Sequence, residues 1–437
     1  MKYNIIDFDS LIHAVDTKES AFLCGNGFSI NFDNRFLASN LSQRLYETHK
    51  HIMAYYSYDI IANSEYKNKL YGNFNNVFKL LNKIKDENDF INFWESAVLF
   101  AKDISKSDQI IEWLSDNSRI SILRTGHKNI DLVFEIENQA ENYGVLNVNY
   151  EYWSILIYFV LALLEIPNII YVLNRDNAFV NAVLAGGINQ FNKDSLLKSS
   201  KSADILAEAS INGMYTYIRL LFTTNILLYG DSVKAVNLKH WKDINIKNTA
   251  YFLSKFNHIM TTNYDLILEN IINQKVHHLH GKFSKDKCCV LYQSLGVVYD
   301  LIRYDFSTTV IGDYFLAKSF YAITADMASR QFRNTEFKSS FRIMEGIIKN
   351  SKVETIIIFG LNLNNDYHII RTIQASMYFS GIESAHIIYC YYNEEDKNGF
   401  LESYEKCITY ADELNDFVKN KIDVSLIDSK EIINNIF

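Results

Sequence analysis

The sequence predicts an α/β protein in which a parallel sheet is covered by helices on both faces and interrupted by a large helical insertion. The first observation is a set of short apolar runs near the C-terminus, VETIIIF at 353–359 and AHIIYCYY at 385–392, separated by helical patterns. Continuous apolar runs are typical of parallel strands buried on both faces, and their alternation with helices predicts a layered sheet. The second is the mainly helical segment 47–250, far longer than an ordinary connection between two strands.

The N-terminal part reads as a helix followed by a strand. Ser20 to Leu23 is a short apolar run that ends at a glycine-containing loop, which is a strand-to-loop signal. A helix is expected over 37–46. Inside the insertion, bulky side chains near 3.6-residue spacing predict a helix over 89–100, and the segment 205–228 contains another long helical stretch.

Strand signals return in the last third of the chain. The expected strands are 258–260, 289–292, 353–359, 385–392 and 422–427, with helices over 266–272 and 366–378. We therefore expect 1–46 and 251–437 to form the sheet domain and 47–250 to form a helical insertion subdomain. In such sheets a ligand lies beyond the carboxyl ends of the strands.

The composition of the chain indicates which ligands and which cellular compartment to expect. The chain has 437 residues, is 48% hydrophobic and 22% charged, and carries a formal charge of −8. Its Lys and Arg residues are scattered rather than clustered, which disfavours nucleic acid as a ligand. The five cysteines are odd in number and form no CxxC pair, so neither a disulfide framework nor a zinc ribbon is expected. Reduced thiols and the lack of a signal-like N-terminus favour a cytoplasmic protein.

One apolar stretch, from Trp153 to Leu173, could imitate a membrane span. Its continuous apolar part ends at Glu165 and covers only about half the length needed to cross a bilayer. A buried core helix is therefore expected and no membrane contact, with a membrane or interfacial segment as the alternative.

The first candidate site is the segment CGNGFS at 24–29. Gly25 and Gly27 after a buried strand let the backbone approach a phosphate, the next helix can offer free N–H groups, and Ser29 can donate a hydroxyl hydrogen bond. The third glycine of a full dinucleotide fingerprint is absent. The alternative is an ordinary strand-to-helix turn.

Three more polar loops are expected at the edge of the sheet where its strands end. They are MTTNYD at 260–265, VHHLHG at 276–281 and FGLNLNND at 359–366. The first and third could simply cap the helices that follow them. The histidines at 277, 278 and 280 suggest a metal site, but the cysteine or acidic partners expected for zinc are missing.

Taken in order, these four loops resemble the sirtuin-like NAD-binding fold, a Rossmann-like parallel sheet. His280 follows Asn263 by 17 residues. The segments GNGFS, GNFN at 72–75, TTNYD and HLHG are most similar to those of bacterial sirtuin-like proteins. The resemblance covers roughly 15–80 and 245–395.

The resemblance implies a site that takes NAD as its substrate and uses no cofactor. Asn263 would orient water and the ribose hydroxyls, because a neutral amide both donates and accepts. His280, with His278 as runner-up, would relay a proton from a ribose hydroxyl. The residues expected to bind NAD are Gly25, Asn26, Gly27, Ser29, Thr262, Asp265, Gly360, Asn362 and Asp366. Asp265 is also expected to order the Asn263 loop, and Asn26 departs from the alanine usual in sirtuins.

The absence of CxxC pairs bears on the reaction. Sirtuin deacetylases carry two such pairs in a zinc module, so this chain is expected to hydrolyse NAD to ADP-ribose and nicotinamide without metal. The resemblance implies a bacterial antiphage-defence effector that depletes NAD, with a homo-oligomer and a phage-derived or defence-system activator as expected partners. The alternatives are a non-catalytic sensor of NAD or an ADP-ribose derivative, and a protein ADP-ribosyltransferase.

Overall fold

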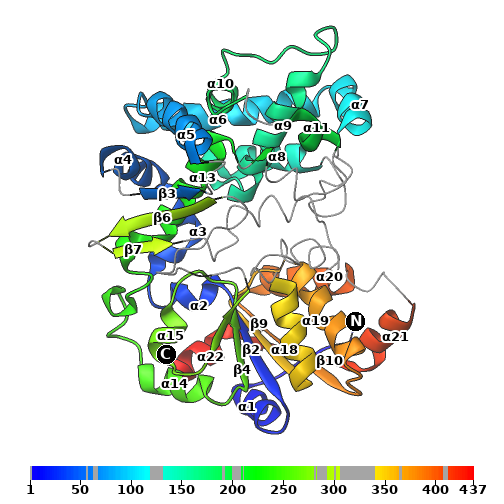
Figure 1. Ribbon diagram of the computed structural model, residues 1–437. Helices are drawn as coiled ribbons and strands as arrows, with labels where there is room; N and C mark the ends of the chain where they lie inside the picture. The colour runs from blue at the N-terminus through cyan, green and yellow to red at the C-terminus, as the bar shows by residue number, and fades with distance from the viewer. Residues whose placement is uncertain are drawn as a thin grey trace. The chain divides into compact units, whose positions relative to one another are not determined.

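The computed structural model divides the chain into two units, each described here by itself (Figure 1). The sheet unit contains Met1–Leu37, Gly230–Lys282 and Thr335–Phe437, and the helical unit contains Ala38–Tyr229 and Phe283–Asn334. The residues that the structure describes are 2–55, 58–62, 67–118, 131–188, 192–198, 208–209, 211–279, 282, 293–299, 302–305, 340–363, 367–406 and 412–437. The boundaries between the units thus fall at 37/38 and 229/230, rather than at the expected 46/47 and 250/251, and 283–334 joins the helical unit.

A seven-stranded sheet, parallel throughout, forms the centre of the sheet unit. Its strands, in spatial order, are β1 (Asn4–Ile5), β10 (Ile422–Asp428), β9 (Ala385–Tyr391), β8 (Thr355–Phe359), β2 (Ser20–Cys24), β4 (His258–Thr261) and β5 (Val276–His278). The predicted α/β class with a parallel sheet is confirmed. The expected strands at 20–23, 258–260, 353–359, 385–392 and 422–427 are present, and the one expected at 289–292 lies outside the described residues. The two- and three-residue strands β1 and β5 were missed, because so few residues carry no periodic signal.

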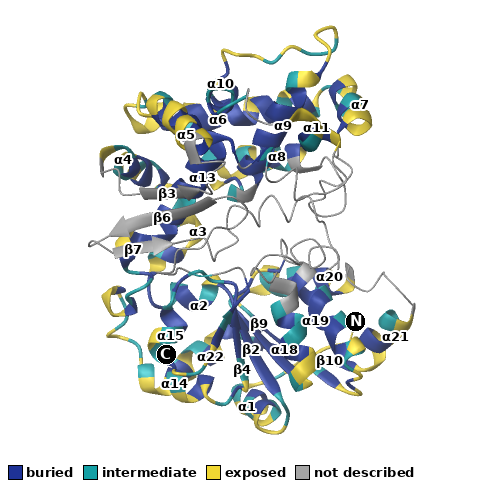
Figure 2. Cartoon of the chain, in the orientation of Figure 1, coloured by how far each residue is buried: buried dark blue, intermediate teal, exposed yellow. Residues whose placement is uncertain are grey.

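Alternate side chains of each strand enter different layers, as the pleat requires. On one face, Leu23, Ile358 and Tyr389 pack with the helices α18 (Ser340–Ser351), α19 (Tyr367–Phe379), α20 (Glu394–Lys406) and α21 (Asp412–Asn420). Figure 2 shows the central strands of the sheet in dark blue, buried among the surrounding helices, and every residue of β2 and β8 is buried.

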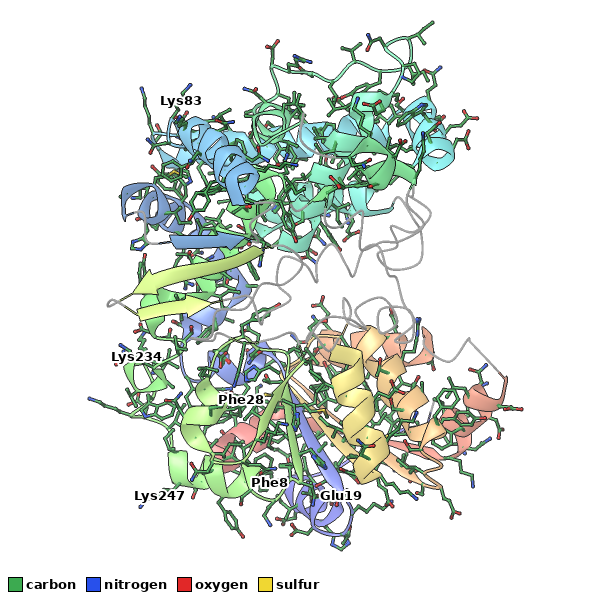
Figure 3. The ribbon with its side chains drawn as sticks, viewed as in Figure 1. Phe8, Glu19, Phe28, Lys83, Lys234 and Lys247 are labelled. Atoms are coloured by element: carbon green, nitrogen blue, oxygen red, sulfur yellow. The ribbon has the colours of Figure 1, made fainter. Side chains whose placement is uncertain are left out.

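The other face is aromatic. Phe22 of β2 lies 5.9 Å from Phe252 of α14 (Ile246–Leu253) and 6.1 Å from Phe359, measured between ring centroids. Phe28, labelled in Figure 3, joins the same layer through Phe359 and Phe437. The helices on this face include α1 (Phe8–Asp16), α15 (Ile267–Ile271) and α22 (Ser429–Ile436). Aromatic rings of this size contribute much of the apolar burial that holds such a layer.

The order of connections reverses at β2 and β8, the centre of the sheet. From β2 the chain later adds β4 and β5 on one side, whereas from β8 it adds β9 and β10 on the other. In doubly wound sheets a ligand crevice forms outside the carboxyl ends of the strands at such a reversal. The loops that follow β2 and β8 meet at this position.

The helical unit is built mainly from ten helices of the described residues. They are α3 (Ala38–Gln43), α4 (Leu45–Tyr55), α5 (Lys67–Leu81), α6 (Glu87–Ser105), α7 (Asp108–Asn117), α8 (Asp131–Tyr143), α9 (Tyr150–Ala162), α10 (Ala178–Ala185), α11 (Lys193–Lys198) and α13 (Gly213–Leu227). The Asp86 side chain caps α6, and the bulky residues at 90, 93 and 94 are buried, as their spacing predicted. The helical stretch expected within 205–228 is present as α13, and the Asn212 side chain caps its start.

The apolar run at 153–164 is a core helix. Residues 152–163 are all buried in α9 and the turn that follows it, and a helix that is apolar on every side belongs inside a protein. None of the helices in the described part of the chain combines the length and apolar content that crossing a bilayer requires.

The insertion contains strands as well as helices. β3 (Tyr58–Ala62) pairs antiparallel with β6 (Gln293–Tyr299), which pairs antiparallel with β7 (Ile302–Asp305). Among the described residues of 47–250, β3 is the one strand in a segment that is otherwise mainly helical, as predicted, and its partner lies more than two hundred residues later in the chain.

Candidate functional site

Four loops of the sheet unit begin where neighbouring strands end at the same edge. Gly25 follows β2, Thr262 follows β4, Leu279 follows β5 and Gly360 follows β8. Because the strands are parallel, the loops with the four predicted motifs emerge at their carboxyl ends. The sheet therefore gathers segments that lie up to 335 positions apart in the sequence, from 25 to 360.

Glycines allow the β2 and β8 loops to touch through their backbones. The Gly27 N–H donates to the Gly360 carbonyl at 2.8 Å, and the Gly25 N–H donates to Phe359 O at 3.0 Å. A Cβ on Gly27 would lie 2.5 Å from Gly360 Cα, and Gly360 itself has φ +60°, a region that favours glycine. Packing of one loop on the other thus requires these glycines, and both N–H groups already have acceptors within the protein.

Asn263 is held in one orientation by the β2 loop. Its Nδ2 donates to Gly25 O at 3.0 Å and to Ser29 Oγ at 2.8 Å, and its backbone N–H donates to Thr261 Oγ1 at 3.0 Å. Both amide protons are therefore committed. No donor among the described residues reaches Oδ1 of this half-buried side chain, so the amide offers an acceptor at a fixed position.

A buried carboxyl lies behind this amide. Ser29 Oγ donates to Asp265 Oδ2 at 2.7 Å, and Asp265 Oδ1 accepts the Ile267 N–H at 3.0 Å. Burial raises the pKa of Asp265, and the hydrogen bonds from Ser29 and Ile267 offset only part of that effect. The chain Asp265–Ser29–Asn263 fixes the Asn263 loop through the Ser29 hydroxyl, whose proton is thereby directed away from any ligand.

His278 fixes the same loop from the other side. β5 places it beside Thr261 in the register, with Nδ1 2.8 Å from Asn263 O and Nε2 2.8 Å from Glu269 Oε1. Both partners are acceptors, so the ring satisfies both contacts only when both nitrogens carry protons, as an imidazolium. Burial by itself raises the pKa of Glu269, but the hydrogen bond and charge of His278, together with Lys282, outweigh it and lower that pKa. His278 is therefore a positioning residue in this arrangement.

The three histidines do not gather as metal ligands would. His277 and His278 are successive residues of β5, so their side chains leave opposite faces of the strand. Both ring nitrogens of His278 are already engaged, and His280 lies outside the described residues. Across the ranges that the structure describes, no group of three His, Cys, Asp or Glu side chains is placed to hold a metal ion.

The other predicted residues occupy varied positions. Thr262 is buried, and its N–H donates to Cys24 O at 3.0 Å. Asn26 is exposed, and its Nδ2 donates to Phe36 O at 2.6 Å instead of reaching over the loop. Asn362 is exposed beyond the Gly360 turn, and Asp366 lies outside the described residues.

The two cysteines that the structure describes are both buried and offer no reactive thiol at this edge. Burial raises the pKa of Cys24, directly before the first loop, to about 12. Cys390 is also a buried free thiol, and the remaining three cysteines lie outside the described residues.

Two groups around the site were not anticipated from the sequence. One is Glu269, whose contact with His278 depends on the pairing of β4 with β5. The other is Asp33, which is fully buried and accepts two hydrogen bonds from the Arg35 guanidinium, at 3.0 and 2.7 Å. Burial opposes ionisation of Asp33, but the hydrogen bonds from Arg35 and the Lys239 N–H lower its pKa to about 2.

This ion pair joins two points of the chain that are far apart in sequence. Arg35 also bridges to Asp231 at 3.0 Å. The two acids lie just before the chain leaves the sheet unit at Leu37 and just after it returns at Gly230. The cluster thus links the two chain segments at the boundary of the sheet unit, which is a structural role.

Comparisons with known proteins were made at three levels. Scanning with protein-family models, and searching curated proteins and solved structures, found no match.

Proposed function

We propose that this chain hydrolyses NAD at the carboxyl edge of its parallel sheet, releasing nicotinamide and ADP-ribose. The observation that carries the proposal is Asn263, a neutral amide whose protons are both committed and whose Oδ1 is presented beside the β2–β8 reversal. The ordered segments GNGFS, TTNYD and HLHG, which resemble those of sirtuin-like proteins, support the same substrate.

The chemistry of the reaction fits such a group. Nicotinamide in NAD is a cationic substituent that departs neutral, so no acid is required to protonate it. The ribose carbon then develops oxocarbenium character and accepts the oxygen of water, and one water proton is released. Asn263 Oδ1 can accept a hydrogen bond from that water or from a ribose hydroxyl, which positions the nucleophile without adding charge.

The neighbouring groups serve to hold this acceptor still. Ser29 and Gly25 fix the amide, while His278 fixes the backbone carbonyl of the same residue. Precise placement of a reacting group supplies a large share of catalysis, so a rigid loop is the property that this site needs. His280 is the proposed proton relay on the basis of its position in the HLHG segment.

The test is nicotinamide release from NAD by the purified full chain. Asn263→Ala should reduce kcat at least about a hundredfold, the scale of a lost positioning contact, with the fold retained by circular dichroism. Asn435→Ala, which changes an exposed asparagine of α22, is the matched control and should keep wild-type turnover. Wild-type turnover in a folded Asn263→Ala protein would overturn the assignment.

The same reaction mixture separates the two alternatives. Saturable NAD binding without nicotinamide release would identify a sensor, and nicotinamide release with labelled protein but no free ADP-ribose would identify a protein ADP-ribosyltransferase. A role in antiphage defence is part of the proposal. It requires that cellular NAD falls on phage infection with the wild-type chain and not with Asn263→Ala.

A further inference from the structure

A buried arginine in the helical unit lacks an acceptor. Arg219 lies in the middle of α13 and is 2% exposed. Both terminal nitrogens of its guanidinium are buried, and neither has a hydrogen-bond partner. Within the described ranges it takes part in no ion pair.

A buried arginine without an acceptor keeps its positive charge, because a guanidinium is not deprotonated at physiological pH. Buried charges in proteins are normally paired, since an isolated one loses its hydration without compensation. A guanidinium offers its donors in a planar fork that matches two oxygens of one carboxylate or phosphate. The missing partner is thus an oxyanion that the described residues do not supply at this position.

Helix α13 packs against α9 as well as against α4, α5 and α10. Phe222 lies one turn after Arg219 on the same face, and its ring centroid is 4.8 Å from that of Tyr150 at the start of α9. Two further hydroxyl groups without partners, those of Tyr150 and Ser154, follow one face of α9 at i and i+4 spacing. Two neighbouring helices, α13 and α9, therefore carry a buried cation and two neutral donors without partners, in apolar surroundings where hydrogen bonds are strong.

We propose that the helical unit binds a small oxyanion, a phosphate or carboxylate group, at Arg219, with the Tyr150 and Ser154 hydroxyls as further donors. The site lies wholly within the helical unit. It is independent of NAD hydrolysis, and its test uses no NAD, so the two proposals can fail separately.

The test measures binding to the full chain in two ways. Equilibrium dialysis with radiolabelled inorganic phosphate gives the affinity, and Tm is followed with phosphate, acetate or chloride at matched ionic strength. Phosphate stabilises many proteins through exclusion from their surface, so only a saturable effect that depends on Arg219 counts. Wild type should bind one of the two oxyanions saturably. An effect of phosphate alone indicates a phosphorylated ligand, and an effect of acetate alone a carboxylate.

Three variants test whether binding depends on Arg219 and Tyr150. Arg219→Met should abolish binding and, in chloride, melt at or above the wild-type temperature, because it removes an unpaired buried charge. Arg175→Met changes an exposed arginine of the same unit and should bind as wild type does. Tyr150→Phe keeps the ring contact and should weaken binding about fivefold, as expected for one lost hydrogen bond.

Two results would overturn the proposal. One is the absence of saturable binding of either oxyanion by wild type. The other is unchanged affinity in folded Arg219→Met, or in Tyr150→Phe should the first variant fail to fold.

Discussion

Gly27→Ala tests whether the glycines of the β2 loop serve loop packing or only ligand approach. The added Cβ would lie 2.5 Å from Gly360 Cα and 3.0 Å from Gly360 O. Carbon atoms pack at about 3.5–4.0 Å, so the β8 loop must retreat by about 1 Å or more. That movement stretches the hydrogen bond from the Gly27 N–H to Gly360 O, now 2.8 Å.

Two costs add. Overpacking of a tight contact typically costs about 1–3 kcal/mol, and one weakened backbone hydrogen bond about 1 kcal/mol, so we expect a loss of about 2–4 kcal/mol in the free energy of unfolding. The measurement is urea denaturation of the protein without NAD. The matched control is Gly346→Ala in α18, where a Cβ meets nothing within 4 Å; there alanine should stabilise by about 0.5–1 kcal/mol.

The result that would refute this reasoning is wild-type stability of Gly27→Ala without NAD. If such a protein bound NAD weakly, the glycine would be required for approach of the ligand rather than for contact with Gly360. If it bound NAD normally, neither role would stand.

Two further predictions concern buried hydrogen bonds and pH. Ser29→Ala removes the hydroxyl that joins Asn263 to Asp265, and should cost about 1–3 kcal/mol of unfolding free energy at neutral pH. The pKa of Asp265 is higher in the folded protein than its ordinary value of 3.8, so the protein loses stability as pH rises from 3.8 through the folded pKa. Without the Ser29 donor the folded pKa rises further, and this loss of stability becomes larger. Urea denaturation of the wild type and of Ser29→Ala over this pH range measures the loss of stability. Parallel profiles of unfolding free energy against pH would contradict the prediction. In the helical unit, burial lowers the pKa of His49, which bonds Tyr217 at 2.8 Å, to about 4. Because this pKa is depressed from 6.5, His49 stabilises above pH 6.5, and up to about 3 kcal/mol is lost as pH falls towards 4. His49→Gln should flatten that part of the stability profile, and an unchanged slope would show that other groups cause it.

The sequence alone determined the elements whose pattern is local. The strands β2, β8 and β9 were predicted because each is a mainly apolar run of five to seven residues that a central parallel strand must bury, and β10 because of its β-branched residues. The core helix α9 was predicted because charge and proline end its apolar run too early for a bilayer. The sequence also predicted that three of the polar loops follow strands and share one edge of the sheet, whereas β5, before the fourth loop, was not predicted.

Only the tertiary structure decided which groups meet at that edge. The Ser29 hydroxyl joins Asn263 to Asp265, and His278 joins the Asn263 backbone to Glu269. Spacing could not predict these contacts, because they depend on β2 lying between β4 and β8 and on β5 lying beside β4. The pairing of β3 with β6 was hidden for the same reason. Periodicity records which face of an element is buried, whereas the partner of that face depends on how distant segments pack.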